Sequence, residues 1–395
     1  MNFERYEGES REAFILRVYQ YKADTGNITN DEAGEICNRV LDECFDESAY
    51  RKLATSFLKV WDKVKEEYAP DDRLKEIEER EHQLRLEKIK VQTLNLGLNE
   101  KDRYQARREL ALEQIRTYID NLKPIEIPDY KEIQKGGVIA IAGSADEHFG
   151  KEVVIEGLGE EPLNVYNEDV FYKRMWNYLN HLIDLIQSEG ISKITYFGLS
   201  DSIEGILRVS GLQHIKYGII ESSIVYANFM ATWLNELSRY VKIDYYACLG
   251  NHTEIRPLGS KSGDFAKENM QIVIDEMLKL SLINNDRVTI HKTKAIQYVD
   301  IDGYKVLATH GQDEKNLVNS VVAYKEIYDV KVDLMISGHL HNSKQETVSL
   351  WTKCVQFPSL IGIDSYSMKL KKTSKAEGKV ILVKGKRFIN IDIEL

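Results

Sequence analysis

The chain has 395 residues, more than the ~100–200 of a usual single domain, so it should contain two domains or one large domain with extensions. Its composition, 43% hydrophobic and 29% charged with six prolines, excludes collagen-like, mucin-like and globally disordered proteins. The net charge of -10 argues against a protein that coats nucleic acid through its overall electrostatic field, while a local basic surface stays open.

The N-terminal residues and the cysteines both indicate a reducing, cytoplasmic location. Residues 1–7 are acidic and lack the basic and then apolar layout of a signal peptide. No later segment approaches the ~18 apolar residues of a membrane span, so we expect no membrane partner. The chain has no CxxC pair, which argues against a disulfide framework or a thiolate zinc site; its cysteines are Cys37, Cys44, Cys248 and Cys354.

Residues 1–68 are expected to form a small helical domain. Residues 29–32 fit a capping box that opens a helix through Val40, and a second helix should run from residue 48 to 61. Two short helices on a small turn are the minimum of a helix-turn-helix. A domain for protein contact is an equal alternative, because the first fifty residues hold twelve acidic against five basic side chains. The candidates to face DNA are Tyr50, Arg51, Lys52 and Thr55.

Residues 69–123 are highly charged and are expected to form a long helical spacer. Apolar residues recur there every seven positions, at Ile77, Leu84, Val91 and Leu98. The companion heptad position is polar, so the seam is poor, and self-association into a homo-oligomer is an open expectation. A basic cluster lies near the middle of the spacer, where a solvated helix face is the first interpretation and phosphate contact the second; it comprises Lys101, Arg103, Arg107 and Arg108.

The third part, residues 124–395, is predicted to be an α/β domain. The helical pattern ends before Pro124, and Pro128 follows in a short linker, which places a boundary there. From Val138 onward, apolar strand-like segments alternate with helical stretches at 169–187 and 219–240.

Five strand-like segments of this domain each lead into residues of metal-binding type. The segments are 138–142, 194–197, 245–249, 306–309 and 334–336. Ligands of open α/β sheets bind beyond the carboxyl ends of the strands, so residues at five such ends can share one site. In chain order the residues that follow are Asp146 and His148, then Asp201 and Glu204, then Asn251 and His252, then His310, and finally His339 and His341.

The ligand types select the metal. Imidazoles, carboxylates and an amide without thiolate suit Mn²⁺, Fe or Zn²⁺ better than a structural zinc cage, and their number exceeds the need of one ion. We therefore expect two divalent ions that share a carboxylate, with Mn²⁺ as the first choice and Zn²⁺, Fe or Mg²⁺ as alternatives. Such a pair, ~3.5–4 Å apart, can activate water and stabilise an in-line displacement at phosphorus.

In this order the motifs resemble those of the calcineurin-like metallophosphoesterases: D-x-H, G-D-x-x-D/E, G-N-H, H and G-H-x-H, over residues 138–357. The resemblance implies an α/β fold, a four-layer α/β/β/α sandwich with a dinuclear site at one edge, preceded here by an α-helical N-terminal extension. Three departures remove no ligand: Ser200 replaces glycine, Glu204 replaces the more frequent aspartate, and Thr253 stands where an acidic residue is common.

The resemblance also implies roles for the site residues. Asp201 would bridge the two ions. His252 would protonate the leaving oxygen or steady the transition state, and Glu204 could orient its imidazole. The ligands of one ion would be Asp146, His148, Asp201 and His341, and those of the other Asp201, Asn251, His310 and His339.

The leading hypothesis is a DNA nuclease in which a metal-bridging hydroxide attacks the phosphorus of a phosphodiester. A phosphomonoesterase acting on phosphoprotein or nucleotides is the alternative, because the same centre serves both substrate classes and Arg256 could contact either phosphate. A catalytically silent DNA-binding or assembly scaffold ranks third, because the ligand set is intact. The layout also resembles phage and prophage proteins described as DNA-repair exonucleases or phosphatases, for which the host cytoplasm would be the location.

Overall fold

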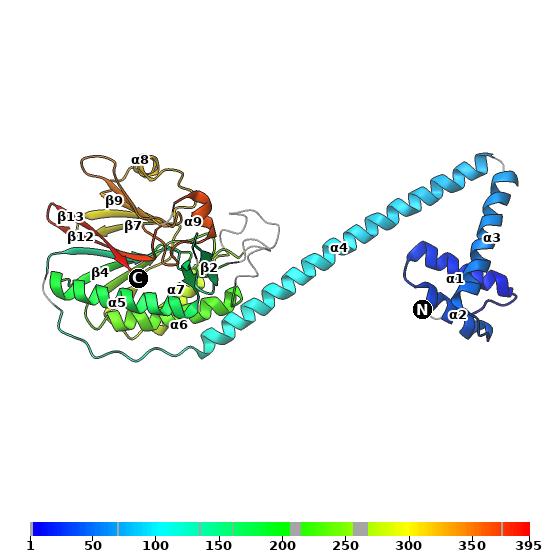
Figure 1. Ribbon diagram of the computed structural model, residues 1–395, viewed down its shortest axis with the longest axis horizontal. Coiled ribbons are helices and arrows are strands. Elements are labelled where there is room, and N and C mark those ends of the chain that lie inside the picture. The colour runs from blue at the N-terminus through cyan, green and yellow to red at the C-terminus, as the bar shows by residue number, and fades with distance from the viewer. Residues whose placement is uncertain are drawn as a thin grey trace. The chain divides into compact units, whose positions relative to one another are not determined.

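A computed structural model describes residues 3–68, 71–133, 136–159, 161–205, 215–255, 268–372 and 374–395. The chain forms two compact units, Met1–Arg107 and Arg108–Leu395 (Figure 1). Within the described ranges, no helix combines the length and the apolar character that a membrane crossing requires.

The first unit begins with three helices, α1 (Arg11–Thr25), α2 (Asn30–Leu41) and α3 (Glu47–Tyr68). The predicted capping box is present at the start of α2, where the Thr29 side chain accepts from the Glu32 N–H and the Glu32 carboxylate accepts from the Thr29 N–H. The helices enclose a small apolar core that includes Phe14, Val18 and Cys37. The helices predicted for residues 29–40 and 48–61 are thereby confirmed.

The charged segment, for which one or two long helices were expected, is the single long helix α4 (Asp71–Asn121). Its residues 79–92 are exposed on every side, so Leu84 and Val91 have no apolar cover within the described chain. Self-association through this stretch stays a prediction. The last turns differ, because Ile115, Tyr118 and Ile119 pack against the core of the second unit. The division between the units therefore lies at residues 107 and 108 rather than at the end of the helix.

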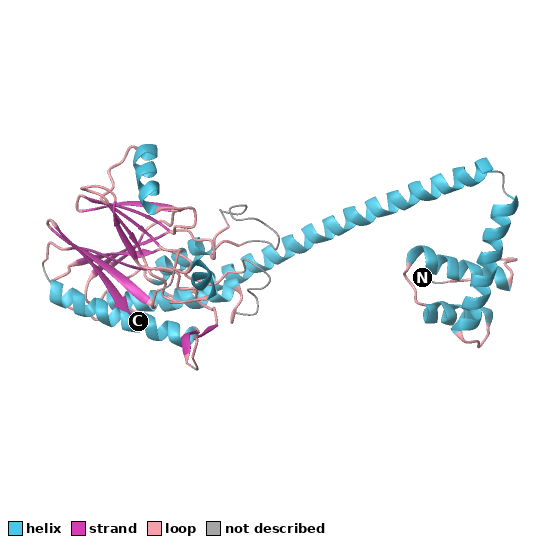
Figure 2. Cartoon of the chain, turned by 45° about the horizontal axis from the view of Figure 1, so that its top comes forward, coloured by secondary structure: helices cyan, strands magenta, loops and turns pink. Residues whose placement is uncertain are grey.

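Two sheets form the centre of the second unit, as Figure 2 shows in magenta. The six-stranded sheet has the order β13-β12-β1-β4-β5-β6, in which β1, β4, β5 and β6 are parallel and β12 and β13 pair antiparallel. Its strands are β1 (Ile139–Ser144), β4 (Lys193–Gly198), β5 (Lys242–Ala247), β6 (Val288–Ile290), β12 (Glu377–Lys384) and β13 (Arg387–Glu394).

The five-stranded sheet has the order β10-β11-β9-β8-β7, with β11, β9 and β8 parallel. Its strands are β7 (Ile296–Ile301), β8 (Tyr304–Thr309), β9 (Leu334–Ser337), β10 (Lys344–Thr347) and β11 (Lys353–Gln356). A separate hairpin pairs β2 (Val153–Glu156) with β3 (Pro162–Tyr166).

The alternation of side chains along each strand divides the core into three layers. On β1, Ala140 and Ala142 face a helical layer, whereas Ile141 faces the other sheet. The helical layer consists of α5 (Glu168–Glu189), α6 (Ile219–Leu237) and α7 (Met270–Ser281). On the far side, α8 (Leu317–Tyr328) covers Leu307 and Met335 of the five-stranded sheet. Figure 1 shows α5 and α6 on one side of the sheets and α8 on the other.

This order of layers, helices on a sheet, a second sheet and a further helix, confirms the predicted four-layer α/β/β/α sandwich with an α-helical extension. All five predicted strand segments are strands, and the two predicted helical stretches are α5 and α6. A short helix, α9 (Ser365–Leu370), lies between the last strand of one sheet and the returning strand β12 of the other.

Candidate metal centre

The parallel strands place the predicted ligands at one edge of the sandwich. β1, β4 and β5 run side by side in one sheet and β8 and β9 in the other, so their carboxyl ends lie together. Backbone hydrogen bonds tie the following loops to one another: the N–H of Asp146 donates to the carbonyl of Ser200 (3.1 Å), and that of His148 to the carbonyl of Asp201 (2.8 Å).

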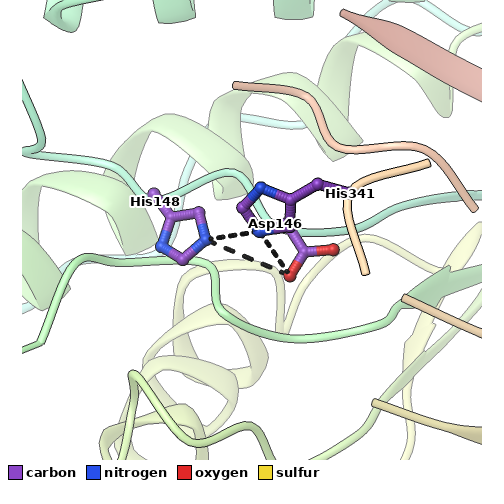
Figure 3. Close-up of side chains that lie close together, drawn as sticks. All are labelled: Asp146, His148 and His341. Carbon is purple, nitrogen blue, oxygen red and sulfur yellow. Dashed lines mark hydrogen bonds and ion pairs between the residues drawn. The ribbon is translucent and has the colours of Figure 1, made fainter. Parts of the chain in front are cut away.

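The first cluster consists of Asp146, His148 and His341, all buried (Figure 3). The Nε2 atoms of His148 and His341 lie 3.2 Å apart, and the Oδ1 atom of Asp146 lies 4.0 Å and 3.5 Å from them, respectively. Three ligand atoms from two sheets thus converge on a single point.

The second cluster consists of Asp201, His310 and His339. His310 Nε2 lies 2.9 Å from Asp201 Oδ2, 3.2 Å from His339 Nδ1 and 3.2 Å from the side-chain oxygen of Asn251. Its other nitrogen, Nδ1, lies 2.7 Å from the Leu199 carbonyl, which can only accept a hydrogen bond. The proton of neutral His310 therefore resides on Nδ1, which leaves Nε2 free to bind a metal.

The donor set fits divalent ions. Asp146 Oδ1 is buried and accepts no hydrogen bond in the described structure, while the imidazole nitrogens of His148, His310 and His341 surround it at 3.5–4.0 Å. Ligands ~2.0–2.2 Å from one ion stand about this far apart. A buried anionic oxygen without a donor is costly, and a cation bound by the surrounding nitrogens would remove that cost.

Six residues of the centre have left-handed backbone conformations, which cost non-glycine residues ~1–3 kcal/mol each. The φ angles are 53° for Asp146, 45° for His148, 72° for Ser200, 52° for Asp201, 72° for His339 and 55° for His341. Such strain concentrates where the surrounding fold fixes a functional geometry. Here five of the six residues are predicted ligands: Asp146, His148, Asp201, His339 and His341.

Two motif glycines permit the close approach of the loops. A Cβ on Gly250 would lie 2.3 Å from Asp201 Oδ1, and one on Gly205 would lie 1.8 Å from the His252 carbonyl oxygen. Only glycine leaves room for the His252 N–H to donate to Asp201 Oδ1 at 2.8 Å.

Electrostatics in the metal-free centre follow from burial and close charge pairs. Burial opposes the charged form of His310, but Asp201 outweighs it and raises the pKa of His310 to about 9. Likewise, Asp146 overcomes burial and raises the pKa of His341 to about 10. Burial and the neighbouring His310 lower the pKa of His339 to about 4. Burial also opposes ionisation of Asp201, yet the adjacent histidines hold the pKa of that carboxyl far below its usual range.

An outer layer of charges contacts the back of three imidazoles. Glu204 Oε2 lies 2.7 Å from His148 Nδ1 and 3.2 Å from His252 Nδ1. Asp364 Oδ1 lies 3.3 Å from His341 Nδ1. Lys151 Nζ stands between the two carboxylates, 3.7 Å from Glu204 and 3.1 Å from Asp364. At these distances the carboxylates are ion-pair partners of the protonated imidazoles, while the Nδ1 atoms of His148, His252 and His341 make no hydrogen bond of regular geometry in the described structure.

The sequence prediction did not include Asp364 or Lys151. Asp364 is the N-cap of α9, where its carboxylate also accepts from the Ser367 N–H. Residues 364–367 have the composition of a capping box, but only the fold brings that box to His341. Lys151 follows the Asp-x-His motif closely, yet a lysine there has no spacing signal.

The predicted DNA-facing residues of the first unit are only partly at the surface. The prediction is wrong for Tyr50, which is 2% exposed and donates to Asn38 and Glu43 inside the helical core. Its apolar ring fills the space between α2 and α3, so it cannot face a ligand. Arg51, Lys52 and Thr55 are exposed, and Arg51 lies 3.3 Å from Glu47 of its own helix. Arg256 lies outside the described residues, as do the side chains of Lys101, Arg103, Arg107 and Arg108.

A family model and a related protein both match this chain in sequence. Residues 1–69 match the family of the YonJ N-terminal domain. The chain is 28% identical over 382 residues to the SPbeta prophage-derived protein YonJ of Bacillus subtilis (strain 168), covering 94% of this chain and 93% of YonJ.

Solved structures align with about two thirds of the chain. They include a novel archaeal phosphodiesterase (13% identity, 65% of this chain and 100% of that chain, TM-score 0.32) and a Vps29 from Entamoeba histolytica complexed with zinc (11%, 64% and 99%, TM-score 0.29). A predicted phosphoesterase from Streptococcus pneumoniae TIGR4 also aligns (8%, 65% and 99%, TM-score 0.28).

Proposed function

We propose that this protein is a metal-dependent phosphodiester hydrolase whose substrate is DNA. One observation supports this most: two Asp/His clusters share a single edge of the sandwich, a buried one with Asp146 and a largely buried one with Asp201. Two divalent ions bound there, Mn²⁺ as first choice, would activate water and offset charge on the phosphoryl oxygens. Five of the seven ligand-type residues have a left-handed backbone, and such strain concentrates at functional sites.

The division of work among the chain's own residues follows from the contacts. Asp201 belongs to the second cluster and also lies close to His148 and His252, which suits it to join the two clusters. Asn251 presents its side-chain oxygen to His310 and completes the second ligand set. Asp146 accepts from the backbone N–H of His339 at 2.8 Å, so its second oxygen remains for the centre.

His252 is placed to protonate the leaving oxygen. Its Nδ1 faces Glu204, so its Nε2, on the opposite side of the ring, can hold the proton to be transferred. Burial opposes the charged form, but Glu204 and Asp201 outweigh it and raise the pKa of His252 above its ordinary value. A raised pKa favours the protonated imidazole, which suits an ester whose leaving group is a poorly stabilised alkoxide, such as the sugar oxygen of a nucleotide.

Two chromogenic esters test the substrate class. The Mn²⁺-loaded protein should hydrolyse bis-para-nitrophenyl phosphate faster than para-nitrophenyl phosphate, and His310→Ala should abolish both activities. Preference for the monoester would favour the alternative, a phosphatase of phosphoprotein or nucleotides with the same centre. If His310→Ala keeps both activities, the proposed centre is contradicted. The matched control is His291→Ala, which changes a histidine outside the centre that lies 3.3 Å from Asp244.

A further inference from the structure

A short segment of the second unit, which begins at Asp364 and ends at Ser374, contacts the metal centre at both ends. At its start, Asp364 contacts His341 and the Tyr366 hydroxyl lies 3.3 Å from His339 Nε2. At its end, the Ser374 hydroxyl donates to the carbonyl of His341 at 3.1 Å. The described residues between these anchors, 365–372, therefore lie at the rim of the centre rather than elsewhere on the surface.

The exposed face of this segment carries one aromatic ring. Tyr366 is 38% exposed, and its ring lies 5.9 Å from that of His339 and 5.5 Å from that of His341, centroid to centroid. On α9, residues three and four positions further along share its face. These are Lys369 and Leu370, both exposed.

The same segment carries lysines that no described carboxylate neutralises. Lys369, Lys371 and Lys372 are exposed and form no ion pair within the described residues, whereas Lys375 pairs with Glu394 at 2.7 Å. The only acidic residue between 361 and 375 is Asp364, which is buried between His341 and Lys151. The rim thus keeps three uncompensated positive charges.

The helix ends at Lys371, its C-cap, which has a left-handed backbone with φ 55°. Asp42 of α2 and Asp329 of α8 end their helices in the same way, so this conformation belongs to helix termination. Lys371 and Lys372 therefore lie in the turn that follows α9.

We propose that α9 and its following turn bind single-stranded nucleic acid, with a base on the ring of Tyr366 and the flanking phosphates on Lys369, Lys371 and Lys372. Aromatic rings beside a basic track are the usual means of holding a single strand, because every base has a face that can stack. A base inside a duplex cannot meet the ring, so the rim selects unpaired strands or frayed ends. The inference rests on the proposed function, for which it names the form of the substrate.

Binding can be measured apart from catalysis. The full chain with His252→Gln keeps the proposed ligands, and with Mn²⁺ present its affinity for a fluorescent eight-residue oligothymidylate is followed by anisotropy at several salt concentrations. Tyr366→Ala should weaken binding between about 5- and 100-fold, the range of one lost base stack. Tyr366→Phe, which keeps the ring, should bind like the parent.

The lysines are tested by the salt dependence. Neutralising Lys369, Lys371 and Lys372 together to glutamine should reduce the slope of log affinity against log salt by about 2, at ~0.7 per phosphate contact. Lys375→Gln is the matched control, since its charge is already paired, and should leave the slope and the chromogenic activity unchanged. Melting temperatures of all variants show that each is folded.

The outcomes separate the two proposals. Affinity for the single strand unchanged in Tyr366→Ala, or an equal loss in that variant for the single strand and for a blunt duplex of the same length, would overturn the rim while hydrolysis of the chromogenic diester by the wild type still stands. A wild type that hydrolyses no phosphate ester would overturn the proposed function, regardless of its affinity for the oligothymidylate.

Discussion

At the scale of single residues, three imidazoles of the centre each have a carboxylate next to their Nδ1 atom. Glu204 contacts two imidazoles, His148 and His252, and so connects a ligand with the proposed acid. The sequence resemblance predicted the pairing of Glu204 with His252, and the 3.2 Å separation agrees with it. The contact of Glu204 with His148 could not be predicted, because it depends on the left-handed turn at residue 148.

Replacing His252 by alanine should lower kcat for bis-para-nitrophenyl phosphate by ~10²–10⁴, the usual share of a general acid. Its backbone N–H still donates to Asp201, so the affinity for Mn²⁺ should change much less than kcat. Steady-state kinetics with parallel calorimetry of metal binding separate the two effects. An equal loss in both would identify His252 as a ligand and not as the acid.

Metal binding should release protons. In the metal-free protein the pKa values of His310 and His341, about 9 and about 10, lie above the ordinary 6.5, so both are charged at pH 7. Their ion pairs stabilise the metal-free fold fully below the unfolded-state pKa, and this stability is lost as the pH rises through 9 and 10. Ligands must be neutral, so affinity for Mn²⁺ should increase from pH 7 toward pH 10.

Calorimetry in two buffers of different ionisation enthalpy measures the released protons directly. At pH 7 we expect about two protons per chain, one from each of these histidines. The same binding heat in both buffers would contradict the charged state of the metal-free centre. His291→Ala, outside the centre, should leave the proton count unchanged.

At the scale of elements, the sequence predicted the strands that carry ligands because each joins an apolar segment to a motif. It did not predict the order of the sheets, since β12 returns from the end of the chain to pair with β1. Nor did it reveal α9, a six-residue helix without an apolar period. The contribution of α9 to the centre, through Asp364, arises from that long-range return and not from local pattern.

A glycine in the loop after β5 gives the sharpest test at this scale. Gly250→Ala places a methyl group 2.3 Å from Asp201 Oδ1, so the loop must move away from the centre. We expect Mn²⁺ affinity to fall by at least ~10-fold, as when groups that hold metal ligands are disturbed. Gly137→Ala is the matched control, because a Cβ there meets no atom within 4 Å. Equal metal affinity of both variants would contradict the described loop geometry.

At the scale of the whole molecule, the helical first unit and the α/β second unit have separate cores. The YonJ relative spans both, so the combination is not particular to this chain. The sequence predicted both parts from composition and periodicity. It named Tyr50 as a candidate to face DNA because that residue lies on the second helix of a possible helix-turn-helix, but its ring is buried in the core of the first unit.

The first unit should contribute to DNA binding through its remaining exposed candidates. Arg51→Ala with Lys52→Ala should weaken binding of double-stranded DNA several-fold, because each lost phosphate contact reduces the electrostatic affinity. The loss should be much smaller for turnover of the chromogenic diester. Anisotropy and initial rates measure the two, and an equal loss in both would show that the units do not divide these tasks.

The most direct test of the central claim is cleavage of end-labelled DNA by purified, metal-stripped protein to which Mn²⁺ is added back. The account predicts metal-dependent cleavage of single-stranded DNA that is absent from His310→Ala prepared in parallel. No cleavage by a wild type that binds Mn²⁺, or equal cleavage by the variant, would contradict it.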